Sequence, residues 1–394
     1  MGRLGLVFAA LMAMSGCTMN DFAFGPFEDV GVPQTGMIEP MPLAMGESFG
    51  SGPVRVALLL PLTGDAALAS VGLSMANASK LAIAFVEQSP AIGENITVVL
   101  KDTGASAATA AEAASQAVAE GASLILGPLK ADQVTAAGSV ARAAGIPLIG
   151  FSNNTGAAAP GIYLLNVLPE VEARRSLGYA RSEGNLAFAG IFPTTNFGRI
   201  QEGAFRQAAA DLGLTIRAIH TFSTEAEART AIEQLIPFVK SGQIDTLFLP
   251  DRATAPSFAA LLEAAGIVQG SLTLIGSADW EADPTIAQTP YLVGALFPAV
   301  DEAGYLAMKV DYQARFGGIP HPLATIAYTA TILANNSTLS MGSPRYDRSQ
   351  LTLAAGFNGR DGVFRFLADG RSEYALTMKQ VTPGGAIRVD GPKL

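Results

Sequence analysis

Several loops of this sequence carry hydroxyl, amide and carboxylate side chains directly after apolar runs that predict buried strands. The richest is Ser152-Asn153-Asn154-Thr155, which follows the apolar run beginning at Pro147. Hydroxyl and amide groups of this kind can hydrogen-bond a carboxylate or amide ligand. Asp251 and Asp279 follow two later runs and could pair with an amine. These residues predict a site for a small polar molecule.

The same side chains also have a purely structural interpretation. Ser, Thr, Asn and Asp are favoured at helix N-caps and turns, where they satisfy backbone N–H groups. Trp280, the only tryptophan, is more often a packing residue than a ligand platform. Both interpretations stay open, and Ser152, Asn153 and Asp279 are the strongest ligand candidates.

The sequence lacks the motifs of metal binding, serine hydrolysis and nucleotide binding. Neither histidine, His220 or His321, has the spacing of a metal motif such as H-E-x-x-H. Gly150-Phe-Ser-Asn-Asn154 has only the first half of the G-x-S-x-G elbow of serine hydrolases. Neither G-x-G-x-x-G nor a Walker A sequence occurs. We therefore expect no catalytic residue, no metal and no cofactor, and interpret the chain as non-enzymatic.

The scaffold for these loops follows from the apolar pattern. From Val54 onward, short apolar runs alternate with alanine-rich segments of helical spacing, with Gly, Pro or Asn at the junctions. Such runs suit parallel strands that crossover helices bury on both faces. Because the carboxyl ends of parallel strands share one edge, the polar loops would meet there. One series precedes Leu168 and another follows it, which predicts an α/β fold of two doubly wound parallel-sheet lobes.

The element boundaries can be stated for each series. The predicted strands are 54–61, 96–102, 123–128, 147–152, 187–193, 214–222, 246–250, 272–277 and 292–298. The predicted helices are 68–88, 106–120, 131–143, 169–182, 199–211, 225–240, 254–265, 303–316 and 323–335. A strand-rich end at 362–389 indicates that the chain recrosses between lobes. We expect lobe 1 to comprise 54–167 and 298–345, and lobe 2 168–297 and 346–394, joined by a hinge.

The first residues indicate export. Arg3, an apolar run from Leu4 to Ala13 and a small-residue site precede Cys17, the only cysteine. The run is too short to span a bilayer. Met14-Ser-Gly-Cys17 resembles the bacterial lipobox, which implies a signal peptide over 1–16 and lipid on Cys17. Thr18 after it implies the periplasmic side of the outer membrane. An ordinary signal peptide with an incidental cysteine is the alternative.

Composition bounds the remaining possibilities. Residues 17–53 are rich in Gly, Pro and Met and lack apolar periodicity, which predicts a flexible tether. Hydrophobic residues make up 49% and charged residues 15%, as in a well-packed globular protein. The net charge of -9 and the absence of a Lys/Arg run exclude nucleic acid as an expected partner. The only membrane contact we expect is the lipid anchor.

Several segments resemble the type I periplasmic-binding-protein superfamily, which includes the branched-chain amino-acid-binding proteins of ABC importers. The resembling segments are 56–64, 124–128, 145–150 and 356–366. The resemblance covers nearly all of the chain after the tether. It also puts Phe197 where importer proteins often hold an aromatic ring over the ligand. The candidate cleft residues are therefore Thr63, Ser152, Asn153, Asn154, Thr155, Phe197, Asp251 and Asp279.

Within that superfamily, 127–134, 165–173 and 244–251 are similar to the penicillin-binding protein activators, lipoproteins that stimulate peptidoglycan synthases. The similarity covers only the C-terminal domain of that family. The helical-repeat domain of some members would not fit between Cys17 and Val54. The first hypothesis is therefore an outer-membrane lipoprotein that activates a class A penicillin-binding protein. The second is a solute-binding protein that closes on an amino-acid-like ligand for an importer.

Overall fold

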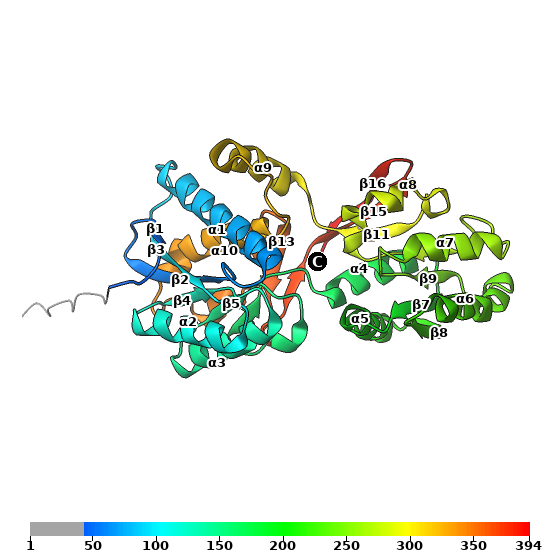
Figure 1. The fold of residues 1–394 in the computed structure, drawn as a ribbon, viewed down its shortest axis with the longest axis horizontal. Coiled ribbons are helices and arrows are strands. Elements are labelled where there is room, and N and C mark those ends of the chain that lie inside the picture. Colours follow the sequence, from blue (N-terminus) through cyan, green and yellow to red (C-terminus); the bar gives the residue numbers. More distant parts are fainter. Residues whose placement is uncertain (1–42) are drawn as a thin grey trace, which may run out of the picture. The chain divides into compact units, whose positions relative to one another are not determined.

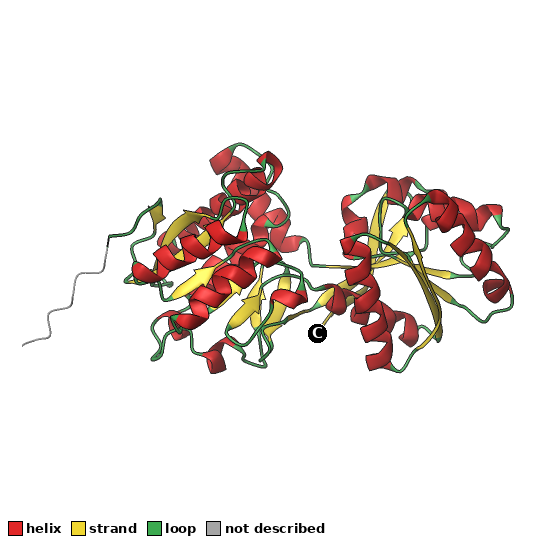
Figure 2. Ribbon diagram, turned by 60° about the horizontal axis from the view of Figure 1, so that its bottom comes forward, coloured by secondary structure: helices red, strands yellow, loops and turns green. Residues whose placement is uncertain are grey.

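The computed structural model describes residues 43–394, apart from the side chain of Ala282. The predicted signal peptide, the lipidation of Cys17 and the predicted tether up to residue 42 lie outside the described residues. Two α/β lobes make up the described part, each built on its own sheet (Figure 1). Helices flank both sides of each sheet (Figure 2). The predicted fold class is confirmed.

Lobe 1 is built on a six-stranded sheet in the order β1-β3-β2-β4-β5-β6. Its parallel strands are β2 (Val54–Leu60), β3 (Ile96–Asp102), β4 (Leu124–Leu126), β5 (Leu148–Gly150) and β6 (Ile162–Leu164). Helices α1 (Ala66–Glu87), α2 (Ala107–Ala119) and α3 (Ala131–Ala143) follow β2, β3 and β4. The short 3-10 helix η1 (Thr155–Ala157) precedes β6.

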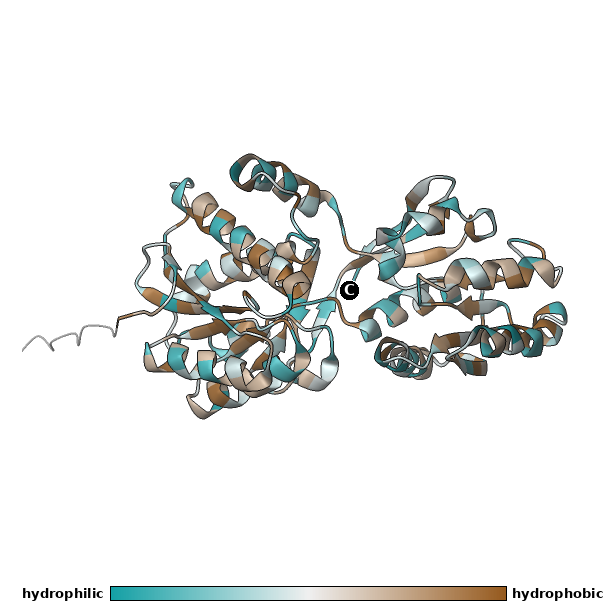
Figure 3. Ribbon diagram, in the orientation of Figure 1, coloured by the Kyte–Doolittle hydropathy of each residue, from teal (hydrophilic) through white to brown (hydrophobic). Residues whose placement is uncertain are grey.

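Burial of both faces explains the continuous apolar run of β2. Val56 and Leu58 face α1 and a later helix, α10 (Ala324–Asn335). Ala57 and Leu59 face the alanines of α2 and α3. Hydrophobic residues accordingly run along the central strands of both sheets (Figure 3). α1 is long and apolar enough to cross a membrane, but 56% of its most apolar window is buried in the lobe, as in a core helix.

The end of the predicted tether belongs to lobe 1. β1 (Ser48–Phe49) pairs antiparallel with β3, so the prediction of a tether reaching residue 53 is wrong for this part. Just before β1, Met45 is held by a buried ion pair, Lys101 with Glu120 (Nζ to Oε1, 2.9 Å). Lys101 donates to the carbonyl of Met45, and the Met45 N–H donates to Glu120. A two-residue strand made by pairing leaves no periodic signal in the sequence.

Lobe 2 is built on a seven-stranded sheet in the order β16-β15-β11-β10-β9-β7-β8. Its parallel strands are β7 (Ala187–Pro193), β8 (Thr215–Phe222), β9 (Thr246–Phe248), β10 (Thr273–Ile275) and β11 (Leu296–Ala299). Antiparallel strands β15 (Leu376–Thr382) and β16 (Gly385–Lys393) complete it. Helices α4 (Pro169–Ser182) and α5 (Asn196–Leu212) pack on one face, and α6 (Glu225–Lys240) and α7 (Ala255–Ala264) on the other. Short helices η2 (Ala278–Ala282), α8 (Pro284–Gln288) and η3 (Pro290–Leu292) lie between β10 and β11.

The C-terminal part of the chain differs from the prediction in which lobe residues 346–374 belong to. A small antiparallel sheet of β12 (Phe357–Gly359), β13 (Gly362–Phe366) and β14 (Ser372–Tyr374) lies in lobe 1, as do α9 (Ala303–Phe316), α11 (Ser337–Ser340) and α12 (Arg348–Leu351). The prediction assigned 346–394 as a whole to lobe 2. Residues 346–374 instead pack in the lobe 1 core, because Phe364, Phe366 and Tyr374 form an aromatic face there.

The chain crosses between the lobes at three places, near 165–168, 300–302 and 375. The crossing segments are hydrogen-bonded to one another. Ser372 Oγ donates to the Asn166 carbonyl (2.7 Å), and Thr377 Oγ1 donates to the Ala299 carbonyl (3.0 Å). These bonds bring together residues distant in sequence beside the loops that carry the predicted site.

Gly198, in the first turn of α5, should be intolerant of substitution. A Cβ there would lie 1.8 Å from the Pro193 carbonyl oxygen at the end of β7. Gly198→Ala should therefore lower the free energy of unfolding by about 1–3 kcal/mol, measured by urea denaturation. Gly203→Ala in the same helix meets nothing within 4 Å and should raise it by roughly 0.5–1 kcal/mol. Equal effects of the two changes would contradict the close approach.

Candidate functional site

The loop after β3 in lobe 1 is organised around Asp102. Its Oδ1 accepts the N–H groups of Leu62 (2.8 Å) and Gly104 (2.8 Å), and its Oδ2 accepts the hydroxyl of Thr63. Partial burial acts to raise the pKa of Asp102, but these hydrogen bonds outweigh it and the pKa is lowered. Thr63, a predicted cleft residue, therefore has a structural partner on the neighbouring strand.

The loop after β5 contains the predicted Ser-Asn-Asn-Thr cluster. Ser152 is buried and its Oγ accepts the Asn154 N–H (3.1 Å). Asn154 Oδ1 accepts the Gly156 N–H (3.0 Å) and caps the 3-10 turn η1. Thr155 Oγ1 donates to Glu170 Oε1 (2.8 Å). Asn153 is exposed and forms no hydrogen bond within the described residues.

The first turn of α4 contributes two carboxylates that face these loops. Glu170 receives the Thr155 hydroxyl, while its other oxygen, Oε2, is buried and has no partner among the described residues. Glu172 accepts the backbone N–H of Ala278 (3.2 Å), where the loop after β10 begins η2. The start of α4 thus joins a lobe 1 loop to a lobe 2 loop.

The lobe 2 loops after β9 and β10 are tied to each other. Ser277 is buried and its Oγ donates to the Pro250 carbonyl (2.7 Å). Asp251 accepts the Ala253 N–H (3.3 Å) and the Thr254 hydroxyl (2.8 Å), which fixes the start of α7. Asp279 is exposed and has no hydrogen bond within the described residues, although Arg252 and Asp251 lie close enough to affect its pKa.

The structure therefore brings some predicted residues together and separates others. Thr155 and the Asp279 loop meet through the start of α4, while Ser152 and Asn154 stabilise the same lobe 1 loop. Phe197 is half-buried in the first turn of α5, behind the N-cap Thr195. The described hydrogen bonds link neither Phe197 nor Thr63 to this group. Trp280 is buried, in agreement with a packing role.

The sequence analysis missed Glu170 and Glu172 as site residues. Acidic residues in the first turn of a helix are common, because they interact favourably with the helix dipole, so their presence alone carried no signal. Their importance comes from burial. Burial raises the pKa of Glu172 to about 8; the Ala278 N–H lowers it, and the charges of Asp279 and Glu170 raise it further.

The electrostatics of this edge favour a cation over an anion. Although the Asp279 residue as a whole is exposed, partial desolvation of its carboxyl also raises its pKa; Arg252 opposes this rise and Asp251 adds to it. The carboxyls here, Glu170, Glu172, Asp251 and Asp279, outnumber the cations that act on them, which are Arg252 near Asp279 and Arg371 near Glu170. The group could hold an amine or a basic side chain of a partner.

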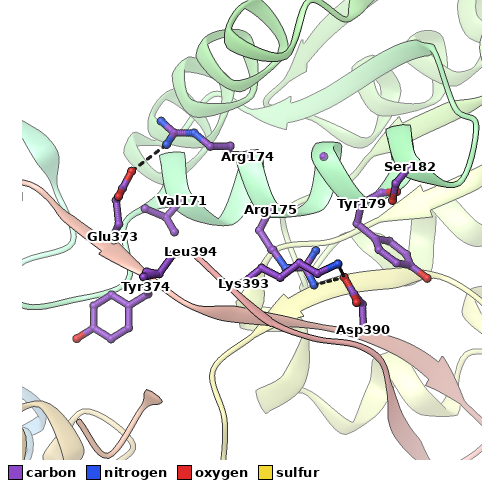
Figure 4. A pocket seen from close by; sticks show the side chains of 11 residues that line it. Val171, Arg174, Arg175, Tyr179, Ser182, Glu373, Tyr374, Asp390, Lys393 and Leu394 are labelled. Carbon is purple, nitrogen blue, oxygen red and sulfur yellow. Dashed lines mark hydrogen bonds and ion pairs between the residues drawn. The ribbon is translucent and has the colours of Figure 1, made fainter. Parts of the chain in front are cut away.

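A separate groove of about 270 Å³ runs along the other side of α4 (Figure 4). Its cations are neutralised within the fold. Arg174 pairs with Glu373 (3.1 Å), and Arg175 and Lys393 both pair with Asp390 (2.6 and 2.8 Å). None of the predicted cleft residues lines this groove.

Two doubly wound lobes, three crossing segments and polar loops at the carboxyl ends of both sheets define the class of two-lobed binding proteins. The chain belongs to the periplasmic binding protein family, whose model matches residues 53–371. Membership in this family implies a location in the periplasm. A search of the curated proteins found no match.

Solved structures share the fold at low sequence identity. A Rhodospirillum rubrum protein described as a branched-chain amino acid ABC transporter has a TM-score of 0.72 at 20% identity, covering 85% of this chain and 99% of that one. The LpoA C-domain from Haemophilus influenzae, a regulator of PBP1A, has a TM-score of 0.63 at 18% identity, with coverages of 85% and 99%. A Desulfitobacterium hafniense substrate-binding protein in complex with Leu gives 0.62 at 17%, again covering 85% and 99%. These likenesses show the fold alone.

Glu172 should make stability depend on pH. The pKa of Glu172 is about 8 in the folded chain and 4.5 when the fold is lost. Between these pH values the folded chain therefore holds a proton on Glu172 that the unfolded chain loses. Stability from this group is complete below pH about 4.5 and should fall by up to roughly 1.4 kcal/mol per pH unit until about 8. Glu172→Gln keeps a neutral acceptor for Ala278 and should remove that slope, measured by urea denaturation across this range.

The exposed Glu225, whose side chain is 86% accessible, provides the control for this change. Glu225→Gln should leave the pH dependence as in the parent chain. If Glu172→Gln and the parent chain have parallel pH profiles, Glu172 is ionised in the folded state and the raised pKa is wrong.

Proposed function

We propose that this chain is an outer-membrane lipoprotein that docks and activates a class A penicillin-binding protein. The main support is that most of the predicted ligand groups form hydrogen bonds within the chain itself. Thr63, Ser152, Asn154, Thr155 and Asp251 all hydrogen-bond to the chain itself. Glu172 accepts the Ala278 N–H at the start of η2, so this donor is not available to a ligand carboxylate. A protein that acts through its surface needs no free ligand groups at this edge.

Two further observations support the same proposal. The lipobox-like Met14-Ser-Gly-Cys17 and the segment after it would hold the lobes near the outer membrane and give them reach. The LpoA C-domain, a regulator of PBP1A, has the same fold.

Helix α9 offers a surface for docking. Only Met308 and Tyr312 of this helix are buried. Leu306 (49% exposed) and Val310 (67%) lie one turn apart on its outer face, and Ile319 (68%) follows the helix. Exposed apolar side chains grouped in this way mark contact sites for other proteins. We assign the docking contact to this stripe, Leu306, Val310 and Ile319.

The test is peptidoglycan polymerisation and crosslinking by the class A penicillin-binding proteins of the same organism, with and without residues 18–394. This unlipidated chain keeps every described residue, including the segment at Met45 that lobe 1 binds. We expect stimulation by the parent chain and its loss in Leu306→Ser with Val310→Ser. Leu186→Ser with Val268→Ser, which changes side chains 62% and 72% exposed, should stimulate normally.

Two results would count against this proposal. Absence of both binding and stimulation, at concentrations well above micromolar, would argue that no such synthase is the partner. Stimulation that survives the α9 changes would keep the activator function but move the docking contact elsewhere on the lobes.

Solute binding is the second candidate function, and two polar side chains without hydrogen bonds in the described part of the chain, Asn153 and Asp279, favour it. Asn153 and Asp279 have no internal hydrogen bond within the described residues, and the surrounding carboxyls would attract an amine. The family and the leucine-bound relative are consistent with an amino-acid-like ligand. On this reading, Asp279 pairs with the ligand amine and Asn153 with its polar group.

A thermal-shift screen of amino acids and amines tests this candidate. A ligand at about 100-fold its Kd should stabilise the chain by about 2.7 kcal/mol, which is a melting shift of a few degrees. Asp279→Asn should abolish the shift, while Asp311→Asn, an exposed acid on α9, should retain it. A shift that is unchanged in Asp279→Asn would place the ligand at another site.

A further inference from the structure

A cavity of about 300 Å³ lies on lobe 1, away from the loops described above. Gly145, Ile146 and Pro147 line it just before β5, and Gly161 lines it just before β6. It is therefore at the amino ends of the parallel strands, whereas the candidate cleft is at their carboxyl ends. The turn 344–348, which precedes and begins α12, forms its other wall.

Three guanidinium groups line this cavity: Arg142, Arg345 and Arg348. Arg348 donates to the Ala368 carbonyl (3.0 Å). Neither the Arg142 nor the Arg345 side chain has a hydrogen bond or ion pair among the residues that the structure describes. Such a concentration of positive charge is unexpected in a chain of net charge -9.

The one carboxylate in the lining does not neutralise these arginines. Asp347 Oδ1 accepts the Ser349 N–H (2.8 Å) and the Ser349 hydroxyl, so it acts as the N-cap of α12. Three cations against one committed acid leave a net positive lining. An anion would be attracted here.

A buried hydroxyl adds a donor to the same cavity. Tyr163 is only 1% exposed and its ring packs against Phe366, with the centroids 5.2 Å apart. Tyr163 is one of the lining residues, Arg348 and Asp347 of the same lining act electrostatically on its phenol, and its hydroxyl has no hydrogen-bond partner in the described part of the chain. Burial raises the pKa of Tyr163, so the phenol keeps its proton and can donate it in a hydrogen bond.

The turn that carries two of the arginines is held rigidly. Tyr346 adopts a left-handed backbone (φ 51°), a conformation that is unfavourable for a residue with a side chain and persists only where the surroundings enforce it. Its hydroxyl donates to the Ala334 carbonyl (2.9 Å), and its N–H donates to the Leu339 carbonyl (2.7 Å). The buried ring thus fixes the backbone from which Arg345 and Arg348 project.

The groove along α4 makes a useful contrast (Figure 4). It too is lined by three cations, but Glu373 and Asp390 pair with all of them. The lobe 1 cavity lacks such partners for Arg142 and Arg345. The same residue type is therefore structural in one place and available to a ligand in the other.

We propose that the lobe 1 cavity binds a phosphate or pyrophosphate group, presented by a soluble phosphorylated molecule or by a phospholipid headgroup. Guanidinium forks match phosphate oxygens in pairs, and the Tyr163 hydroxyl would donate to a further oxygen. The volume corresponds to about ten water molecules, enough for a pyrophosphate and part of an attached group. This site does not depend on the proposed docking function.

Isothermal titration of residues 18–394 with inorganic pyrophosphate tests the proposal directly. We expect binding that weakens as salt is raised, because the arginines are exposed. Arg142→Gln with Arg345→Gln should weaken it at least about tenfold, since each removes a charge-assisted hydrogen bond. The matched control is Arg217→Gln with Arg388→Gln, two exposed arginines of lobe 2 that have no partner among the described residues.

The control variant loses the same net charge as the test variant, but its two arginines lie in lobe 2 and do not line the cavity. It should therefore bind as the parent chain does. Tyr163→Phe, with stability checked by melting, should weaken binding without a comparable loss of stability.

Flotation with vesicles of phosphatidylglycerol or of phosphatidylcholine distinguishes the two sources of phosphate. Binding to the anionic vesicles that the double arginine change abolishes would identify a headgroup, and binding to pyrophosphate alone a soluble molecule. Equal affinity of the two double variants, or no binding to either probe, would overturn the proposal.

Discussion

Burial of the central strands on both faces is the constraint on which the rest of this structure depends. β2 and β7 contain almost no exposed position, so each must be covered by helices above and below. Only a parallel sheet with crossover helices satisfies that need over a chain of this length. The direction of the strands then puts all loops at their carboxyl ends on one edge of each lobe. The candidate site follows from burial and is not an independent feature.

The start of α4 is where this architecture becomes specific to the chain. In both lobes the carboxyl-end loops satisfy most of their polar groups through caps and turns, with Asn153 and Asp279 as exceptions among the predicted residues. Glu170 and Glu172 extend this internal network from a lobe 1 loop to a lobe 2 loop. A buried carboxyl with a raised pKa is costly, and here the neighbouring acids outnumber the cations that act on them. Such an arrangement is suited to a positively charged group of a ligand or a partner.

The periodic parts of the fold could be predicted from the sequence, and the paired parts could not. The predicted bounds of α3, α4 and α6 agree with the structure, because apolar spacing and flanking Gly or Pro define them. β1 was missed because its two residues become a strand only through pairing with β3, and the three-residue β6, next to β5, was missed as well. Residues 346–374 were assigned to the wrong lobe because alternating aromatics show that a face is buried without showing against what. For the site, residue type predicted Ser152 and Asp279 as polar loop residues, but the burial that perturbs Glu172 depends on three segments far apart in sequence.

The segment from Met45 to Phe49 covers one edge of the lobe 1 sheet and so protects it from aggregation. β3 would be the outermost strand of lobe 1, with a row of unpaired backbone groups, if β1 did not lie along it. Exposed strand edges invite pairing with other chains, and proteins commonly cover them. Here the cover is supplied by the residues that connect the lobe to its N-terminal segment, and the buried Lys101–Glu120 pair holds it in place. The same short stretch therefore attaches the lobe and keeps its sheet from recruiting a second copy.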